Sequence, residues 1–154
     1  MQHAIESRER KLDAFFARAM SAGNDELKSD LARFGAVLVC GYVERCVEVI
    51  ILHRLTTRAQ PRVLLFIRSH FKKGTNYDCE AICQLLIRFD QNWETAFRST
   101  ISRNDQWSSS LASAYALRNS IAHGGDGNKG LPGVEALYTD CKNIVVALVE
   151  ATNN

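Results

Sequence analysis

A single run of helical periodicity, from about Asn24 to Leu55, most constrains the fold of this chain. Within this run apolar residues recur at steps of three and four, which is the spacing that lines one side of an α-helix. The apolar positions are Leu27, Leu31, Phe34, Leu38, Val39, Val43, Cys46, Val47, Ile50 and Ile51. A helix of this length is typical of the central helix of a bundle, so we predict a long helix against which the others pack.

The remaining apolar residues follow the same spacing and predict further helices. We expect a first helix over about residues 4–20 and a sixth over about residues 106–123. The later helices begin at or near a proline or a polar residue that suits a first turn, namely Pro61, Asp78, Asp90, Asn104 and Pro132. No stretch alternates apolar and polar residues at every second position. We therefore predict one all-α domain over residues 1–154, a bundle of about six to seven helices.

The composition favours a folded protein of the cytoplasm. Hydrophobic residues make up 46% and charged residues 23% of the chain, the ordinary balance of a globular protein. No apolar run approaches the ~18 residues that span a bilayer, and residues 1–6 lack the apolar core of a signal peptide. The five cysteines form no Cys-x-x-Cys pair and lie at no zinc-ligand spacing from a histidine. We expect reduced, buried cysteines, no metal or other cofactor, a cytoplasmic location and no membrane contact.

Basic residues gather in one segment, although the net charge is only +2. From Val49 to Tyr77 there is no Asp or Glu, while the segment holds Arg54, Arg58, Arg62, Arg68, Lys72 and Lys73. Such an asymmetry is typical of a phosphate-facing surface, so one interpretation makes Arg54, Arg58, Arg62, Lys72 and Lys73 substrate-binding residues. Arginine stems also cover apolar helix flanks without any ligand, and this second interpretation fits the segment equally.

The segment from Arg118 to Gly125 carries the residues most suited to chemistry. Positions five apart are rotated by about 140° around a helix, so Arg118 and His123 do not share a face. Asn119 and His123 are four apart and do share one, so the Asn119 amide can hold the imidazole in one tautomer. Gly124 and Gly125 are suited to end the helix directly after His123.

An arginine and a histidine without metal ligands nearby suit the cleavage of RNA. RNA carries its own nucleophile, the ribose 2′-hydroxyl, so the protein has only to move protons and to stabilise charge on the phosphate. We expect His123 to move the protons and Arg118 to stabilise the phosphate. One helix cannot easily direct both side chains at one phosphate, and a two-fold homodimer whose sixth helices meet removes this difficulty. The sequence predicts a metal-independent endoribonuclease with a composite site at a homodimer interface.

The same residues resemble a known family. Arg118-Asn119-Ser120-Ile121-Ala122-His123 matches the Arg-x4-6-His motif of HEPN domains, including the polar residue directly after the arginine. With Leu117 and Gly124 the segment looks like the stand-alone and RiboL-PSP-associated branches. The resemblance implies an all-helical, dimeric domain in which Arg118 and His123 are catalytic and Asn119 supports them. It also implies a toxin or antiviral defence effector that has an antitoxin or another defence-system protein as its partner.

Three alternatives stay open at the level of the sequence. Some HEPN domains lack activity, so a non-catalytic binding or regulatory module that pairs with another protein is the alternative function. A short motif also arises by chance, in which case the chain is a helical interaction protein unrelated to nucleic acid. Glu44 interrupts an apolar stretch of the long helix. There it can pair with Arg118 and orient it, or take part in a solvent-exposed ion pair.

Overall fold

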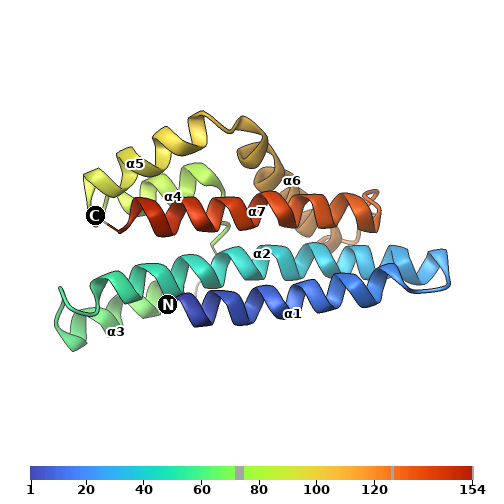
Figure 1. The fold of residues 1–154 in the computed structure, drawn as a ribbon, viewed down its shortest axis with the longest axis horizontal. Coiled ribbons are helices and arrows are strands. Elements are labelled where there is room, and N and C mark those ends of the chain that lie inside the picture. The colour runs from blue at the N-terminus through green and yellow to red at the C-terminus, as the bar shows by residue number, and fades with distance from the viewer. Residues whose placement is uncertain (72–74, 126, 154) are drawn as a thin grey trace.

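The long helix predicted from the periodicity is α2 (Asp25–Leu55), and it forms the spine of the molecule (Figure 1). The computed structural model describes residues 1–71, 75–125 and 127–153, which form seven helices and no strand. The other helices are α1 (Gln2–Met20), α3 (Pro61–His70), α4 (Cys79–Leu86), α5 (Gln91–Ser102), α6 (Asp105–Ala122) and α7 (Leu131–Ala151). The predicted all-α bundle with a long central helix is confirmed.

Short polar side chains fix where the helices begin. The Asn24 Oδ1 accepts the backbone N–H groups of Glu26 at 2.7 Å and Leu27 at 3.3 Å, so Asn24 caps α2. Asp78 caps α4 and Asp90 caps α5 in the same way, each through a 2.8 Å bond from a backbone N–H group. These caps satisfy donors that the first turn of a helix leaves unpaired. Helix starts predicted from the sequence at these positions are therefore correct.

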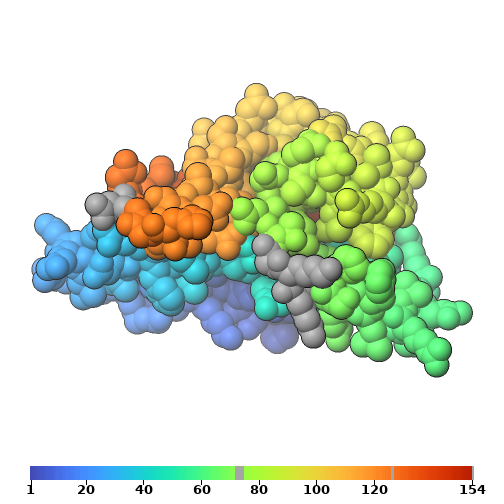
Figure 2. Space-filling model, turned by 180° about the vertical axis from the view of Figure 1, so that it is seen from behind, coloured from blue at the N-terminus to red at the C-terminus, as the bar shows by residue number. Residues whose placement is uncertain are grey.

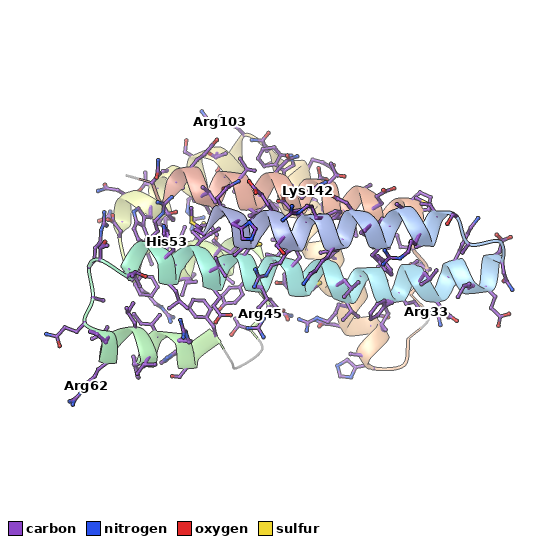
Figure 3. The ribbon with its side chains drawn as sticks, turned by 60° about the horizontal axis from the view of Figure 1, so that its bottom comes forward. Arg33, Arg45, His53, Arg62, Arg103 and Lys142 are labelled. Atoms are coloured by element: carbon purple, nitrogen blue, oxygen red, sulfur yellow. The ribbon has the colours of Figure 1, made fainter. Side chains whose placement is uncertain are left out.

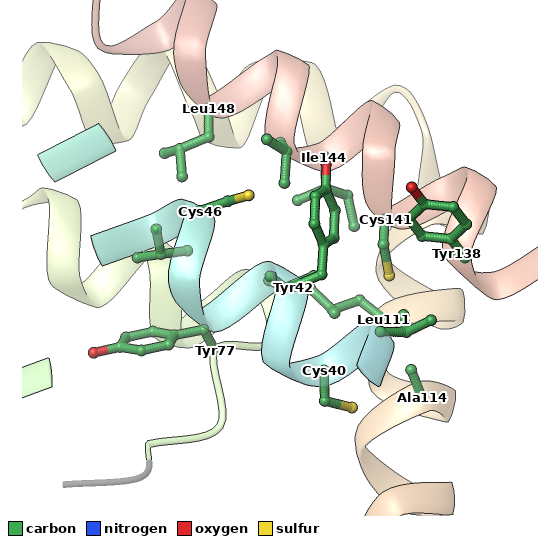
Figure 4. Close-up of a cluster of buried hydrophobic side chains, with 14 of the residues drawn as sticks. Cys40, Tyr42, Cys46, Tyr77, Leu111, Ala114, Tyr138, Cys141, Ile144 and Leu148 are labelled. Carbon is green, nitrogen blue, oxygen red and sulfur yellow. The ribbon is translucent and has the colours of Figure 1, made fainter. Parts of the chain in front are cut away.

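The core lies where α2, α6 and α7 meet (Figure 4). Helices α1 and α7 run alongside α2, while α5 packs on α7 and α4 packs on α5 (Figure 1). The largest fully buried side chains are Trp93, Tyr138, Phe16 and Phe97. Burial of side chains this large removes much apolar surface from water and is the main stabilising contribution to the bundle.

All five cysteines are free and buried, as the sequence predicts. Burial raises the pKa of the Cys46 thiol to about 12 and that of the Cys83 thiol to about 11. Both thiols are therefore protonated at neutral pH and pack as small apolar groups. The described residues contain no helix with the length and apolar character of a membrane span.

Most of the exposed large apolar side chains lie on α2 and α3. On α2, Leu27, Phe34 and Val37 are 48%, 54% and 41% exposed, although two of them follow the helical pattern of the long run. On α3, Leu65 and Phe66 are 64% and 65% exposed. Periodicity alone does not separate such residues from core residues, because it gives the face of a helix and not what covers that face.

Candidate active site at the end of α6

Arg118 lies near the end of α6 and binds residues from two other parts of the chain. Its Nη2 donates to the Glu44 Oε1 on α2 at 3.5 Å and to the Asn76 side-chain oxygen in the segment between α3 and α4. The Arg118 and Glu44 side chains are each about a quarter exposed, at 25% and 26%. The predicted pairing of Glu44 with Arg118 is therefore present, and the fold holds the guanidinium from two sides.

Opposing effects act on the Glu44 carboxyl. Burial raises its pKa above the usual range, while the positive charges of Arg118 and Arg45 lower it. Arg45 forms its own ion pair with Glu48 one turn further along α2, at 2.7 Å. Of the two roles open to Glu44, pairing with Arg118 is therefore the one that the structure has.

The Tyr115 and Cys40 side chains beside Arg118 are uncharged. The guanidinium carbon lies 5.4 Å from the ring centroid of Tyr115, which is buried one turn earlier on α6. Burial raises the pKa of the neighbouring Cys40 thiol to about 12, although Arg118 acts against this shift. The Nε of Arg118 is buried and has no hydrogen-bond acceptor among the described residues. The guanidinium therefore keeps donor capacity that Glu44 and Asn76 do not use.

His123 is the C-cap residue of α6 and is exposed. Its backbone N–H donates to the carbonyl oxygens of Asn119 at 3.1 Å and Ser120 at 3.2 Å. With φ −99° and ψ 16° the residue no longer has α-helical backbone dihedral angles, so the chain turns away from the helix after it. The imidazole is thus presented to solvent at a position that the end of the helix fixes.

Gly124 and Gly125 end α6 in the way the sequence predicts. Gly124 has φ +78°, the left-handed conformation that side chains rarely adopt. Its N–H donates to the Ile121 carbonyl at 3.1 Å, and the N–H of Gly125 donates to the Ser120 carbonyl at 2.8 Å. These two bonds form a Schellman turn. A Cβ at Gly125 would collide with the Ser120 hydroxyl, so the turn that follows His123 requires both glycines.

Asn119 does not play the part expected of it within one chain. No hydrogen bond joins its side chain to the His123 imidazole in the described residues; the two meet through the backbone bond alone. The four-residue helical spacing is kept, since the His123 N–H donates to the Asn119 carbonyl, but both side chains are exposed and the spacing alone does not bring them into contact. The Asn119 side chain is exposed near His123 and stays available to a substrate or a second chain.

Arg118 and His123 therefore face different surroundings. Arg118 is half-buried against α2, whereas His123 lies beyond the helix end in solvent. The described residues also hold no group of three His, Cys, Asp or Glu side chains placed to bind a metal ion.

Comparison with protein families identifies the fold. A family model described as RiboL-PSP-HEPN matches residues 3–154, almost the whole chain. The chain belongs to the RiboL-PSP-HEPN family. No curated protein and no solved structure matched the sequence. Because the match spans α1 to α7, it supports the HEPN assignment well beyond the short Arg-x4-His motif.

The basic residues predicted to bind substrate are dispersed in this HEPN domain. Arg54 donates from Nη2 to the Val149 carbonyl at 3.0 Å and from Nε to the Thr152 hydroxyl at 3.2 Å, so it closes the end of α7. Arg58 lies over the Trp93 ring, 5.7 Å from its centroid. Both therefore have structural roles, which is the second interpretation that the sequence left open for this segment.

Arg62 alone among the described members of that set extends freely from the molecule, at the start of α3 (Figure 3). Lys72 and Lys73 lie outside the described residues. Helix α3 and the end of α6 nevertheless lie on one face, where Figure 2 shows α3 in green and the loop after α6 in orange.

Asn76 is the site residue that sequence reasoning missed. It lies in a non-helical segment, so no periodicity connects it to α6, and its partner is 42 positions away in the sequence. The one available signal was its place directly before Tyr77, an aromatic residue that the fold buries. A buried side chain in a short connection anchors its neighbours, and here that anchoring brings the Asn76 oxygen to Arg118.

Proposed function

We propose that this HEPN domain is a metal-independent endoribonuclease whose active site forms between two copies of the chain. We further propose that it acts in the cytoplasm as a toxin or an antiviral defence effector, as membership of the HEPN family suggests. The observation that carries the proposal is the pairing, at one helix end, of an anchored Arg118 with an exposed His123. The five free cysteines agree with a reducing compartment.

The proposed chemistry needs only these two side chain types. The ribose 2′-hydroxyl oxygen attacks phosphorus and the bond to the 5′-oxygen breaks, which leaves a 2′,3′-cyclic phosphate and a 5′-hydroxyl. His123 of one copy accepts the 2′-hydroxyl proton, and His123 of the second copy donates a proton to the leaving oxygen. Arg118 donates to the phosphate oxygens as their negative charge increases. Exposure of His123 suits the proton transfers, because the substrate must reach it.

An apolar stripe on α2 supports the proposed dimer. Phe34, Val37 and Gly41, which we call the α2 stripe, follow one another at helical steps, and Glu44 comes three residues later. Phe34 and Val37 are about half exposed, and the space around Gly41 is open. Two copies that pack along this stripe about a two-fold axis bury these side chains and bring their α6 ends close together.

The test is RNA cleavage in the presence of EDTA, with His123→Ala and Arg118→Ala as the decisive variants. Matched controls are His53→Ala and Arg103→Ala, which remove an exposed histidine and an exposed arginine elsewhere (Figure 3). The proposal expects cleavage by the wild type and both controls and loss of cleavage in the two decisive variants. Unchanged cleavage in both decisive variants would end the assignment of the site.

A wild-type protein that binds RNA or a protein partner but never cleaves RNA supports the alternative function. In that case the domain is a non-catalytic binding or regulatory module, and Arg118 serves the fold alone. Arg118→Ala lowers the free energy of unfolding under both accounts, so that measurement does not separate them. His123→Ala does, because it changes the rate of RNA cleavage only if the domain cleaves RNA.

A further inference from the structure

Helix α3 is an apolar helix that its neighbours leave uncovered. None of its ten residues is buried, and it packs mainly against α2. Phe66, Leu65 and Val63 are 65%, 64% and 46% exposed. Large apolar side chains grouped in this way on a surface mark an interaction site, since leaving them in water is unfavourable.

A groove of about 220 Å³ separates α3 from the end of α4 and makes this apolar surface concave. Phe66, Ile67 and Phe71 line one side, and Leu85 and Phe89 line the other. We call the pocket that these residues line, together with His70, Tyr77 and Arg88, the α3–α4 groove. In Figure 2 the green atoms of α3 lie beside the yellow-green atoms of α4 on the same face. A concave apolar surface between two helices fits the apolar side of a third helix.

Basic residues lie in and near the α3–α4 groove, and we call them its rim. Arg88 lines the groove itself, and Arg62 and Arg68 are exposed on α3. No acid occurs from residue 49 to residue 77. Of the acids that follow in the chain, Asp78 and Asp90 cap α4 and α5, and Glu80 forms an ion pair with Arg98 at 3.0 Å. A partner that fills the groove therefore meets cations around an apolar centre.

These features discriminate between possible occupants. A second copy of the chain would bring the same cations against this rim, and like charges repel. Single-stranded RNA would satisfy the cations but would leave the aliphatic Ile67 and Leu85 of the groove against ribose and phosphate, where their apolar surface gains little. An amphipathic helix with one apolar side and acidic flanks satisfies both the groove and its rim.

We propose that the α3–α4 groove is the docking site for an acidic amphipathic helix of a partner protein. The groove shares no residue with Arg118, His123 or the α2 stripe, so docking does not depend on the proposed cleavage of RNA. It nevertheless includes Tyr77, which lies next to Asn76 in the chain. A partner held here sits beside the segment that supports Arg118.

The experiment titrates the full chain, labelled with ¹⁵N, with a synthetic helical peptide of about 18 residues that has leucines on one side and glutamates on the other. The proposal expects amide shifts confined to residues 61–71 and 75–90, which hold α3, α4 and the other residues that line the groove. Phe66→Ala and Arg88→Glu should each weaken binding about tenfold or more. Both side chains are exposed, so neither variant should affect folding.

Matched controls separate this site from unspecific attraction. Val146→Ala removes a 52% exposed apolar side chain from α7, and Arg103→Glu reverses an exposed charge outside the groove; both should bind like the wild type. The proposal is overturned if the peptide shifts no amide of α3 or α4, or if a peptide with lysines in place of the glutamates binds equally well. It is also overturned if single-stranded RNA shifts the same amides and displaces the peptide, since the groove would then be an RNA surface.

Discussion

Arg118 and His123 both lie at the end of α6, yet neighbouring residues hold the Arg118 side chain while the His123 side chain is exposed. Arg118 is bound by Glu44 from α2 and by Asn76 from the segment before α4, and it lies against the Tyr115 ring. Among the described residues His123 is held through its backbone alone, and its imidazole is exposed. In the proposed site, one half is therefore held within a single chain, while the other half would gain its contacts from a substrate or a second chain.

This difference separates two kinds of effect that a substitution can have. Removing a bound side chain changes both stability and activity, because its partners lose a buried interaction. Removing an exposed side chain changes activity alone. Measurements of cleavage rate and of the free energy of unfolding on the same variants therefore test the comparison directly.

The largest effect on cleavage is expected for His123→Ala. Loss of a group that moves protons lowers kcat by about 10²- to 10⁴-fold. Because the His123 side chain is exposed, the free energy of unfolding in urea should stay within about 0.5 kcal/mol of the wild type. A variant that is both inactive and clearly destabilised would contradict the separation between the two residues.

Arg118→Ala is expected to lower kcat by about 10²- to 10³-fold and also to destabilise the protein. Glu44 and Asn76 lose their shared partner, so the free energy of unfolding should fall by about 1–3 kcal/mol. Arg118→Lys is the matched control, since it keeps the charge but not the planar set of donors. Full activity in Arg118→Lys would show that a charge near this position suffices and that the guanidinium geometry does not matter.

Asn76→Ala tests whether the support of Arg118 matters for cleavage. We expect kcat to fall about tenfold with KM little changed, because Asn76 positions Arg118 and touches no substrate. Asn76→Asp keeps an acceptor oxygen for the guanidinium and should recover part of the rate. If alanine and aspartate at this position lower kcat equally, the hydrogen bond to Arg118 is not what Asn76 contributes.

A smaller effect concerns Glu44 and pH. Burial raises the pKa of this carboxyl, so the folded protein holds the proton more tightly than the unfolded chain does. The contribution of Glu44 to stability is therefore present below its ordinary pKa of 4.5 and is lost as the pH rises through the raised value. The Glu44→Gln variant has no carboxyl at this position and does not lose this stability as the pH rises. The free energy of unfolding of Glu44→Gln minus that of the wild type should therefore increase between about pH 4 and about pH 7, by about 0.5 kcal/mol or less.

Urea unfolding of Glu44→Gln and the wild type across this pH range measures that difference. Glu80→Gln is a useful comparison, because hydrogen bonds from Arg98 and Gln84 lower the pKa of that carboxyl. The wild type should lose the contribution of Glu80 as the pH falls, which is the opposite direction. A Glu44→Gln variant that becomes relatively less stable as the pH rises would show that the Arg118 ion pair outweighs burial.

The sequence predicts most of the fold because its signals are local. Helix periodicity, the caps at Asn24, Asp78 and Asp90, and the glycines after His123 each act within a few residues. The pairing of Glu44 with Arg118 was predictable for a different reason, namely a charge placed inside an apolar helical run.

What the sequence does not reveal depends on tertiary placement. Asn76 reaches Arg118 only because the segment between α3 and α4 crosses near α6. Arg54 looks like a phosphate-binding residue in the sequence, but the end of α7 lies beside it and uses its donors. Asn119 has the right spacing for His123, yet both side chains are exposed and no hydrogen bond joins them in the described residues.

The central claim is that the active site is shared between two copies of the chain, and analytical ultracentrifugation combined with a cleavage assay tests it most directly. Val37→Glu places a charge in the α2 stripe, and Val146→Glu places one at a similarly exposed position on α7 as a control. The account predicts that the wild type and Val146→Glu sediment as dimers and cleave RNA. Val37→Glu should sediment as a 17.2 kDa monomer and lose cleavage. A monomer that cleaves RNA at the wild-type rate would contradict the shared site.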